Sequence, residues 1–399
     1  MTHCQVCSKK LIPNILNLGL HPLCDDLIPI NSKKKNQFYK INISYCNNCF
    51  TAFQMHNVNK NKLFPKNYHY RAQLTADVIN GMKELVVEVR KQVGTLKNKK
   101  ILDIGCNDGS LLSLFKLENC KTIGIEPTNA YKDAKKNGHN VYNSYFNLEV
   151  VRKIKKKYKK IDIITFTNVF AHIENFRELI KNLKNLISKE TIIVIENHYL
   201  GAVTNKNQFD TFYHEHPRTY SLNSFLHMQK LLTLNLTRVS FPKRYSGNIR
   251  VFFQKKKYIT NYKFFLKKEK KFQEQLKKMK FKISKWKKKK IKLIKNIVSI
   301  HGPVPAKAFP GRAAIILRLL KVDEKMIKCV YEKNSSLKIN HYVPGTKIPI
   351  LSEKNLLKEK SETPIINLAW HISKEIKMYI SKMGMKNKII DIIEPKDFK

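Results

Sequence analysis

The chain has 399 residues and a formal net charge of +47, from 77 Lys and Arg against 30 Asp and Glu. This length exceeds one ordinary core, so two or three domains are expected, and an apolar share of 42% is enough to pack them. No apolar run approaches the ~20 residues that span a bilayer, and none opens the chain as a signal peptide, which predicts a cytoplasmic protein without membrane insertion.

The positive charge raises the hypothesis of a nucleic-acid partner. Two observations weaken that hypothesis. The cations are mostly Lys rather than Arg, whose planar fork suits base and phosphate recognition, and the Lys residues are spread along the whole chain beside abundant Asn and Ile. A compositional bias explains this pattern better than a nucleic-acid surface, and a nucleotide diphosphate is also an anion that such a charge attracts.

The cysteine spacing predicts a metal site near the N-terminus. Cys4 and Cys7 form one Cys-x2-Cys pair, and Cys46 and Cys49 form a second. Two such turns complete a tetrahedral set of four thiolates, which Zn2+ prefers. With four protein ligands the site is closed, so we expect structural zinc in a module that covers residues 1–65.

A glycine-containing turn follows the first predicted strand of the next domain. After a helix over about 74–94, the segment 100–112 reads as a strand (Ile101–Ile104), a turn, and a helix that begins near Ser110. The turn has the Asp-x-Gly-x-x-x-Gly form seen in S-adenosylmethionine methyltransferases. The strand at 122–126 ends in an acid where a doubly wound sheet places a carboxylate on ribose hydroxyls. The candidate cofactor-binding residues are Asp103, Gly105, Asn107, Asp108, Gly109 and Glu126.

Further strands over 162–167 and 191–196 alternate with helices and predict a mostly parallel sheet in a domain over 66–254. The loop Thr167–Phe170 lacks the Asp/Asn-Pro-Pro-aromatic turn typical of enzymes that methylate an exocyclic base amine. Asn168 and His172 lie four residues apart, so we expect them to share a face where the chain turns into a helix.

The run Tyr213-His214-Glu215-His216 concentrates side chains that move protons near neutral pH. It has no helical period, and its charge does not suit a buried strand. A solvated loop or a metal ligand cluster is the alternative interpretation.

The C-terminal third begins with a Lys-dominated segment over 255–294, which reads as a helical connector, either solvated or polyanion-binding. A second α/β domain is predicted over 295–399. Its expected features are a strand over 297–300, a phosphate-binding turn over 301–308, a strand over 329–332, a rigid turn over 342–350, and a strand over 365–370 that closes the sheet.

The order of these motifs resembles the C-methyltransferases that act on nucleotide-linked keto-deoxysugars, such as deoxysugar C-3′ methyltransferases. The resemblance covers nearly the whole chain, and its specific parts are Tyr-His-Glu-His and the Pro-Gly-Thr turn at 344–346. It implies an α/β protein with a small N-terminal zinc module, a central class I S-adenosylmethionine methyltransferase domain of Rossmann-like fold, and a C-terminal Rossmann-like domain that helps to bind the sugar nucleotide.

The resemblance also implies roles for individual residues. His216 corresponds to the favoured general base, supported by Glu215 and Tyr213. Asn168, His172 and Tyr70 would line the sugar pocket.

Three stretches depart from the family pattern, at positions that we expect to touch the sugar or the nucleotide. They are Tyr245-Ser-Gly-Asn248, the turn at 302–308, and Lys338-Ile-Asn340.

The implied reaction needs no catalytic metal. A neutral His removes a proton next to a ketone, and hydroxyl, amide and imidazole donors stabilise the enolate. Two alternatives stay open at this point: an RNA methyltransferase with a zinc module, and a non-catalytic scaffold that binds nucleotide sugars.

Overall fold

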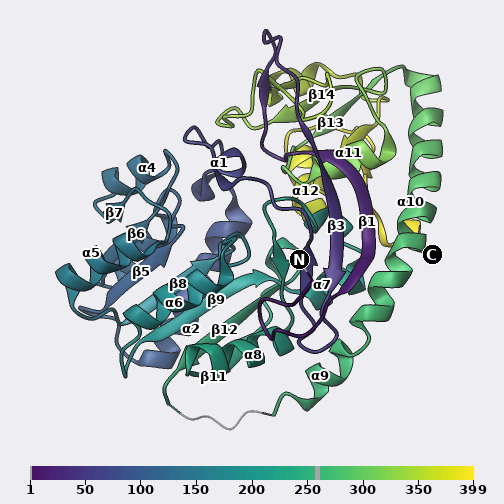
Figure 1. The fold of residues 1–399 in the computed structure, drawn as a ribbon. Helices are drawn as coiled ribbons and strands as arrows, with labels where there is room; N and C mark the ends of the chain where they lie inside the picture. The colour runs from purple at the N-terminus through teal and green to yellow at the C-terminus, as the bar shows by residue number, and fades with distance from the viewer. Residues whose placement is uncertain (1, 257–260) are drawn as a thin grey trace.

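The computed structural model describes residues 2–256 and 261–399, which form three sheet-containing units (Figure 1). The N-terminal unit is an antiparallel sheet of β1 (Ile12–Pro22), β3 (Phe38–Tyr45) and β4 (Ala52–Gln54). A fourth strand, β10 (Arg218–Thr219), comes from a much later part of the chain and pairs with β4. The short helix α1 (Lys60–Leu63) follows this sheet.

The central unit is a seven-stranded sheet that is parallel except for one strand, β12, which runs antiparallel to both its neighbours. Its strand order is β11 (Asn235–Ser240), β12 (Asn248–Gln254), β9 (Ile192–His198), β8 (Ile163–Thr167), β5 (Lys100–Ile104), β6 (Lys121–Ile125) and β7 (Asn140–Tyr142). The prediction of a mostly parallel sheet is therefore confirmed.

Helices cover both faces of the central sheet. Along β5, Ile101 packs with α2 (Ala76–Val93) and α3 (Ser110–Leu117). The next residue, Leu102, points to the other face and packs with α5 (Leu148–Tyr158), α6 (Phe176–Leu186) and α8 (Leu222–Leu232). This alternation follows the strand period of two. The shorter helices are α4 (Tyr131–Lys136) and α7 (Leu200–Lys206).

The C-terminal unit is a five-stranded parallel sheet. Its order is β16 (Ile350–Ser352), β14 (Ile327–Glu332), β13 (Val304–Lys307), β17 (Ile365–Asn367) and β18 (Ile389–Asp391), with α11 (Ala313–Leu320) and α12 (Ser373–Lys382) alongside. A two-stranded ribbon, β2 (Ile28–Pro29) with β15 (His341–Tyr342), joins this unit to the N-terminal one.

The predicted connector over 255–294 contains two helices, α9 (Lys263–Glu269) and α10 (Phe272–His301), while its residues 257–260 lie outside the described part of the chain. In Figure 1, α10 runs along one side of the molecule from α9 to the C-terminal unit, beside β1. It buries an apolar stripe that includes Leu276, Met279 and Trp286, and the Trp286 indole donates a hydrogen bond to the Ile392 carbonyl (3.0 Å).

Three predictions in this region are wrong. The expected strand 297–300 belongs to the last turns of α10, which ends at His301 and is capped by Gly302, where φ is +69°. A four-residue apolar run does not distinguish a strand from a buried helix end. The predicted phosphate turn over 301–308 contains strand β13 instead, and the strand that closes the sheet is β18 rather than the one at 365–367.

In the described ranges, 2–256 and 261–399, no helix has the length and apolar character needed to cross a bilayer.

Candidate functional site

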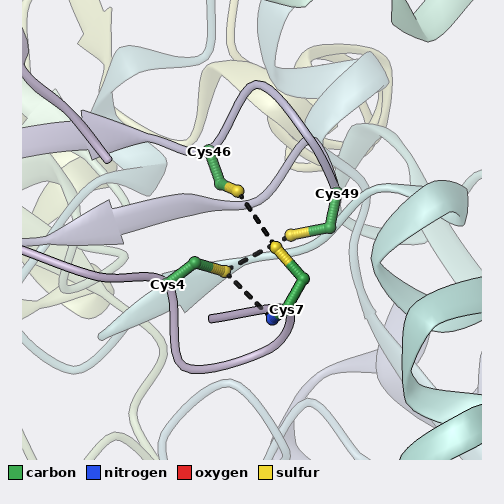
Figure 2. A group of neighbouring side chains, drawn as sticks. All are labelled: Cys4, Cys7, Cys46 and Cys49. Carbon is green, nitrogen blue, oxygen red and sulfur yellow. Dashed lines mark hydrogen bonds between the residues drawn. The ribbon is translucent and has the colours of Figure 1, made fainter. Parts of the chain in front are cut away.

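The four predicted metal ligands converge on one point (Figure 2). The Sγ atoms of Cys4, Cys7, Cys46 and Cys49 all lie within 4.8 Å of one another. Cys4 and Cys7 come from the turn before β1, and Cys46 and Cys49 from the turn between β3 and β4. Four clustered thiols with no carboxylate among them fit Zn2+, and a set of four protein ligands is that of a structural site.

The cysteine cluster is joined to the start of helix α8. The Ser221 hydroxyl donates a hydrogen bond to the Cys49 carbonyl (3.1 Å), and the Thr51 and Ser224 hydroxyls lie 2.7 Å apart. Ser221 is also the N-cap of α8, and its side chain accepts the Ser224 N–H. The metal module therefore fixes the chain just after the Tyr-His-Glu-His run.

One large cavity of about 690 Å3 connects the three units. The central unit lines it with the turn after β5, the carboxyl ends of β6, β8 and β9, and the side chains of Tyr213, Glu215 and His216. The N-terminal unit contributes Asp25, and the C-terminal unit contributes the loops that follow β13, β14 and β17. In open α/β sheets, ligands bind beyond the carboxyl ends of the strands, so this cavity faces the binding edges of both parallel sheets.

The end of the cavity at β5 and β6 fits a nucleoside cofactor. Gly105 has φ of +72°, and a Cβ there would lie 2.5 Å from a methyl carbon of Val169, so only glycine brings the backbone this close. The Glu126 carboxylate is buried and accepts hydrogen bonds from the Thr128 N–H, the Thr128 hydroxyl and the Asn107 N–H. A carboxylate has about four lone-pair sites, so one acceptor position is left for a ligand hydroxyl.

Asp103 also lines this end, and its carboxylate accepts a hydrogen bond from the Thr165 hydroxyl (2.7 Å). Burial raises the pKa of Asp103 to about 7 and also raises the pKa of Glu126.

Two of the predicted cofactor residues have a different position. Asp108 does not line the cavity, and its carboxylate accepts the Ser110 N–H and hydroxyl at the start of α3. Gly109, with φ of +81°, packs against His139 and Ala134. Asn107 does reach the cavity, and its side chain holds the backbone of the segment at 70–72 through Tyr70 and Ala72. Asp108 and Gly109 therefore shape the turn rather than contact the cavity.

His216 is among the residues that line the cavity. Its Nδ1 is 2.9 Å from the Thr211 carbonyl oxygen, which only accepts, so Nδ1 carries the proton and Nε2 has the free lone pair of a neutral ring. The pKa of His216 is lowered to about 4, first by burial and also by the positive charge of Arg312. This ring is therefore neutral at neutral pH, as a general base must be.

Glu215 has a different environment from the predicted one. The partner of His216 Nδ1 is the Thr211 carbonyl, whereas Glu215 is buried against Tyr68 and Asp25, with Lys338 nearby. Burial raises the pKa of Glu215 well above its usual range, and the charge of Asp25 adds to this.

The other predicted pocket residues, Tyr213, His172, Asn168 and Tyr70, all line the cavity. The rings of Tyr213 and His172 lie 4.2 and 4.9 Å from that of His216. Burial raises the pKa of the Tyr213 hydroxyl well above its usual range, so the hydroxyl keeps its proton. The Asn168 side chain accepts from Asn248 (3.2 Å), and its own NH2 group is buried without a hydrogen-bond partner. Asn168 has φ of +56° and lies in a loop before α6, so the expected shared helix face is wrong.

Several cavity residues come from distant segments and have no functional signal of their own in the sequence, and Lys338 was noted only within a stretch that departs from the family pattern. His198, at the end of β9, has its ring 5.3 Å from that of His216. Asp25 and Lys338, from the N- and C-terminal units, form an ion pair at 3.9 Å. Arg312 follows the loop after β13 and is 7% exposed. An isolated Arg or Asp has no local signature, so only the fold reveals these residues.

His214 does not line the cavity. It is buried with its Nε2 3.2 Å from the Tyr39 carbonyl. Lys307, which was expected in a phosphate turn, lies in β13 and is ion-paired with Glu353 at 2.7 Å.

Three family models match successive parts of the chain. They are a "Putative zinc binding domain" over residues 4–64, a "Methyltransferase domain" over 73–237 and a "C-methyltransferase C-terminal domain" over 244–390. The chain is therefore similar, over successive parts, to a putative zinc-binding domain, a methyltransferase domain and a C-methyltransferase C-terminal domain.

A curated relative is the C-methyltransferase NovU of Streptomyces niveus, 24% identical over 251 residues. The alignment spans 62% of this chain and 60% of NovU.

Solved structures match up to about half of the chain. A S-adenosylmethionine-dependent methyltransferase from Archaeoglobus fulgidus is 16% identical, with a TM-score of 0.35, and the match covers 43% of this chain and 93% of that one. The PH0226 protein of Pyrococcus horikoshii is 11% identical, with a TM-score of 0.38, and covers 50% of this chain and 100% of that one.

Proposed function

We propose that the protein transfers a methyl group from S-adenosylmethionine to a carbon next to the ketone of a nucleotide-linked keto-deoxysugar. The observation that carries this proposal is a cavity lined together by His216, with an unprotonated Nε2, by the β5–β6 end and by the loops of the C-terminal sheet.

The cofactor would be held by the turn at 105–107 and by Glu126, whose remaining acceptor position suits a ribose hydroxyl. When bound, S-adenosylmethionine supplies an electrophilic methyl group. Val169 and Ile125 provide apolar surface beside these polar groups. The fit supports a nucleoside cofactor at this end of the cavity.

His216 would remove the proton from the carbon next to the ketone through Nε2. The Thr211 carbonyl holds the opposite nitrogen, Nδ1, in its protonated form and so keeps the lone pair on the cavity side of the ring. General-base catalysis of this kind contributes typically ~10²–10⁴-fold in rate. Glu215 acts elsewhere in the pocket, next to Asp25 and Tyr68.

The enolate oxygen needs donors that are ready before the reaction. Asn168 lines the cavity, and its buried NH2 group lacks a protein partner, which makes it the candidate amide donor. The Tyr213 hydroxyl keeps its proton because its pKa is raised by burial. Tyr70 and His172 complete the set of groups along this wall.

The C-terminal loops would bind the nucleotide part of the substrate. Lys333 and Lys338 follow β14 and line the cavity beside Ser335 and Ser336, which gives a phosphate both positive charge and hydroxyl donors. The "C-methyltransferase C-terminal domain" model and the NovU relative support C-methylation, and the resemblance to deoxysugar enzymes supports the sugar class.

The test is incubation with S-adenosylmethionine labelled at the methyl group and a panel of keto-deoxysugar nucleotides, followed by NMR of the product. We expect label on the carbon next to the ketone. Label on oxygen, or no transfer to any sugar nucleotide, contradicts the proposal.

The same assay separates the RNA methyltransferase alternative. RNA and a nucleotide sugar are added together at moderate salt, where non-specific charge attraction is screened. We expect the nucleotide sugar to be labelled and the RNA to remain unlabelled.

A further inference from the structure

We infer that Arg312, from the C-terminal unit, is a positioning residue for the general base His216, on which it acts through the Asp210–Thr211 turn. This inference rests on the proposed function, because it assigns the residue that orients the proposed base. It also gives the C-terminal unit a role in the chemistry in addition to substrate binding.

A short chain of contacts links the two side chains. The Arg312 Nε lies 3.1 Å from an Asp210 carboxylate oxygen, and its Nη1 donates to the Thr211 hydroxyl (3.2 Å). The carbonyl of the same Thr211 accepts the Nδ1–H of His216 at 2.9 Å. Arg312 therefore holds the residue whose carbonyl fixes both the orientation and the tautomer of the base.

A second residue of the C-terminal unit fixes the same turn. The Trp370 indole N–H donates to Asp210 Oδ2 (2.9 Å), and the Arg312 guanidinium lies over the Trp370 ring, 5.2 Å from its centroid. Trp370 follows β17, and Arg312 follows the loop after β13, so both come from the carboxyl edge of one sheet. The turn before His216 is thus held between two neighbouring loops of another unit.

Burial of the Arg312–Asp210 ion pair costs desolvation free energy. Asp210 is fully buried, and Arg312 is 7% exposed. Replacing a buried ion pair by apolar groups is often neutral or stabilising, so stability alone does not account for this one. A planar guanidinium that contacts both Asp210 and Thr211 has a defined geometry that a Lys ammonium lacks.

Arg312 also acts on His216 through its charge. The groups that face the His216 ring are Tyr213 on its own segment, His172 after β8, His198 at the end of β9, and Arg312. Burial lowers the pKa of both His172 and His198 well below the usual range, so these rings are neutral. The Arg312 guanidinium is then the permanent positive charge among these neighbours, and it disfavours the imidazolium form of His216.

The test compares Arg312→Met with Arg318→Met. Arg318 is the matched control, because it lies in the neighbouring helix α11 but outside the cavity. Its guanidinium lies over the Phe38 ring and donates to the Leu20 carbonyl. The first measurement is 15N NMR of the histidine ring nitrogens, which reports the tautomer of His216 without any substrate. We expect Nδ1–H in the wild type and in Arg318→Met, and a mixture of tautomers in Arg312→Met.

The second measurement is exchange of the substrate proton next to the ketone with solvent deuterium. Misplacement of a reacting group by ~1 Å costs ~10²-fold, so we expect the saturated exchange rate of Arg312→Met to fall by about 100-fold. The exchange rate of Arg312→Met is also measured against pH. The acid limb of this pH–rate profile should move toward neutral pH, because the pKa of His216 rises once the guanidinium is removed. Trp370→Phe keeps an aromatic ring and the Arg312 charge but loses the indole hydrogen bond to Asp210. It should therefore show the tautomer mixture and the lower exchange rate in weaker form, without the shift of the acid limb, and it carries the test if Arg312→Met does not fold.

The outcomes are distinct. An unchanged His216 tautomer in Arg312→Met or Trp370→Phe overturns the inference. A rise in the KM of Arg312→Met with an unchanged saturated exchange rate also overturns it, because that pattern indicates an Arg that binds the substrate. Absence of exchange in the wild type overturns the proposed function instead, and the tautomer measurement then decides on Arg312 by itself.

Discussion

The consecutive residues His214, Glu215 and His216 have three different environments. His214 packs against Tyr39, Glu215 lies between Asp25 and Tyr68, and only His216 has its ring among the other cavity imidazoles. Proximity in sequence thus did not translate into a shared environment. The sequence singled out this run because of its unusual composition, but the partner of His216 is a backbone carbonyl, which has no residue-specific signal.

The first prediction uses this contrast between neighbours. His216→Asn should lose at least ~10²-fold in methyl transfer, because the amide cannot accept the proton. His214→Asn, two residues away and outside the cavity, should keep its activity and lose only some thermal stability. Methyl transfer and melting temperature are measured for both variants. Near-normal turnover by His216→Asn would remove it from the mechanism.

The pH dependence follows from the lowered pKa of His216, which is about 4. A lowered pKa means that the neutral, active form already predominates above that value, whereas an ordinary His would lose its proton only near pH ~6.5. We therefore expect kcat/KM to stay level from about pH 8 down to about pH 6 and to fall only in more acidic buffer. An acid limb centred near pH ~6.5 would contradict this.

Substitution of Glu126 tests whether the β5–β6 end of the cavity binds the cofactor. Its carboxylate has one acceptor position left after three hydrogen bonds from the protein. Glu126→Gln should weaken S-adenosylmethionine binding by about 10- to 100-fold, as expected for a lost hydrogen bond to a charged group. Calorimetric titration measures this, with Glu118→Gln as a control, since Glu118 pairs with Arg90 outside the cavity.

At the scale of elements, the strands with local patterns were predictable and those without were not. The strand and turn at 101–110 carry their signal in adjacent residues, and β5 and α3 lie where expected. The run at 297–300 failed because four apolar residues suit either a strand or a helix, and the continuous packing of α10 decides for the helix. The two-residue strand β10 is too short to leave a pattern.

The zinc module should influence activity without touching the substrate. The cysteine cluster holds the N-cap of α8 through Ser221 and Ser224, five and eight residues after His216. Removal of the metal by a chelator, or Cys46→Ser, should lower both the melting temperature and kcat. Added Zn2+ should restore the chelated wild type but not the variant. Full activity in a verified metal-free protein would separate the module from the site.

For the molecule as a whole, the order of the three units was predictable from the sequence, and the cavity between them was not. The contacts that form it join residues from remote segments, as in the Asp25–Lys338 ion pair and the contact of Arg312 with Asp210. Motif spacing describes each unit separately. Docking of the units depends on side chains that look like ordinary surface residues in the sequence.

The net charge of +47 leads to a prediction for the whole molecule. Self-repulsion destabilises a compact state of high net charge, and salt screens it as the Debye length falls from ~30 Å at ~0.01 M to ~8 Å at ~0.15 M. The melting temperature should therefore rise between these two salt concentrations. A scan at both concentrations of NaCl checks this, and a lower melting temperature at the higher concentration would contradict it.

Strand β10 has a consequence for the order of folding. Phe53 pairs with Arg218, so the first sheet of the chain needs a strand that is synthesised long after the rest of it. Until then, the edge of β4 is unpaired, and exposed edges invite pairing with other chains. Domains usually fold from the N-terminus as synthesis proceeds, but contacts of long sequence separation form slowly. During translation, the first unit to emerge is thus expected to be among the last to complete its fold.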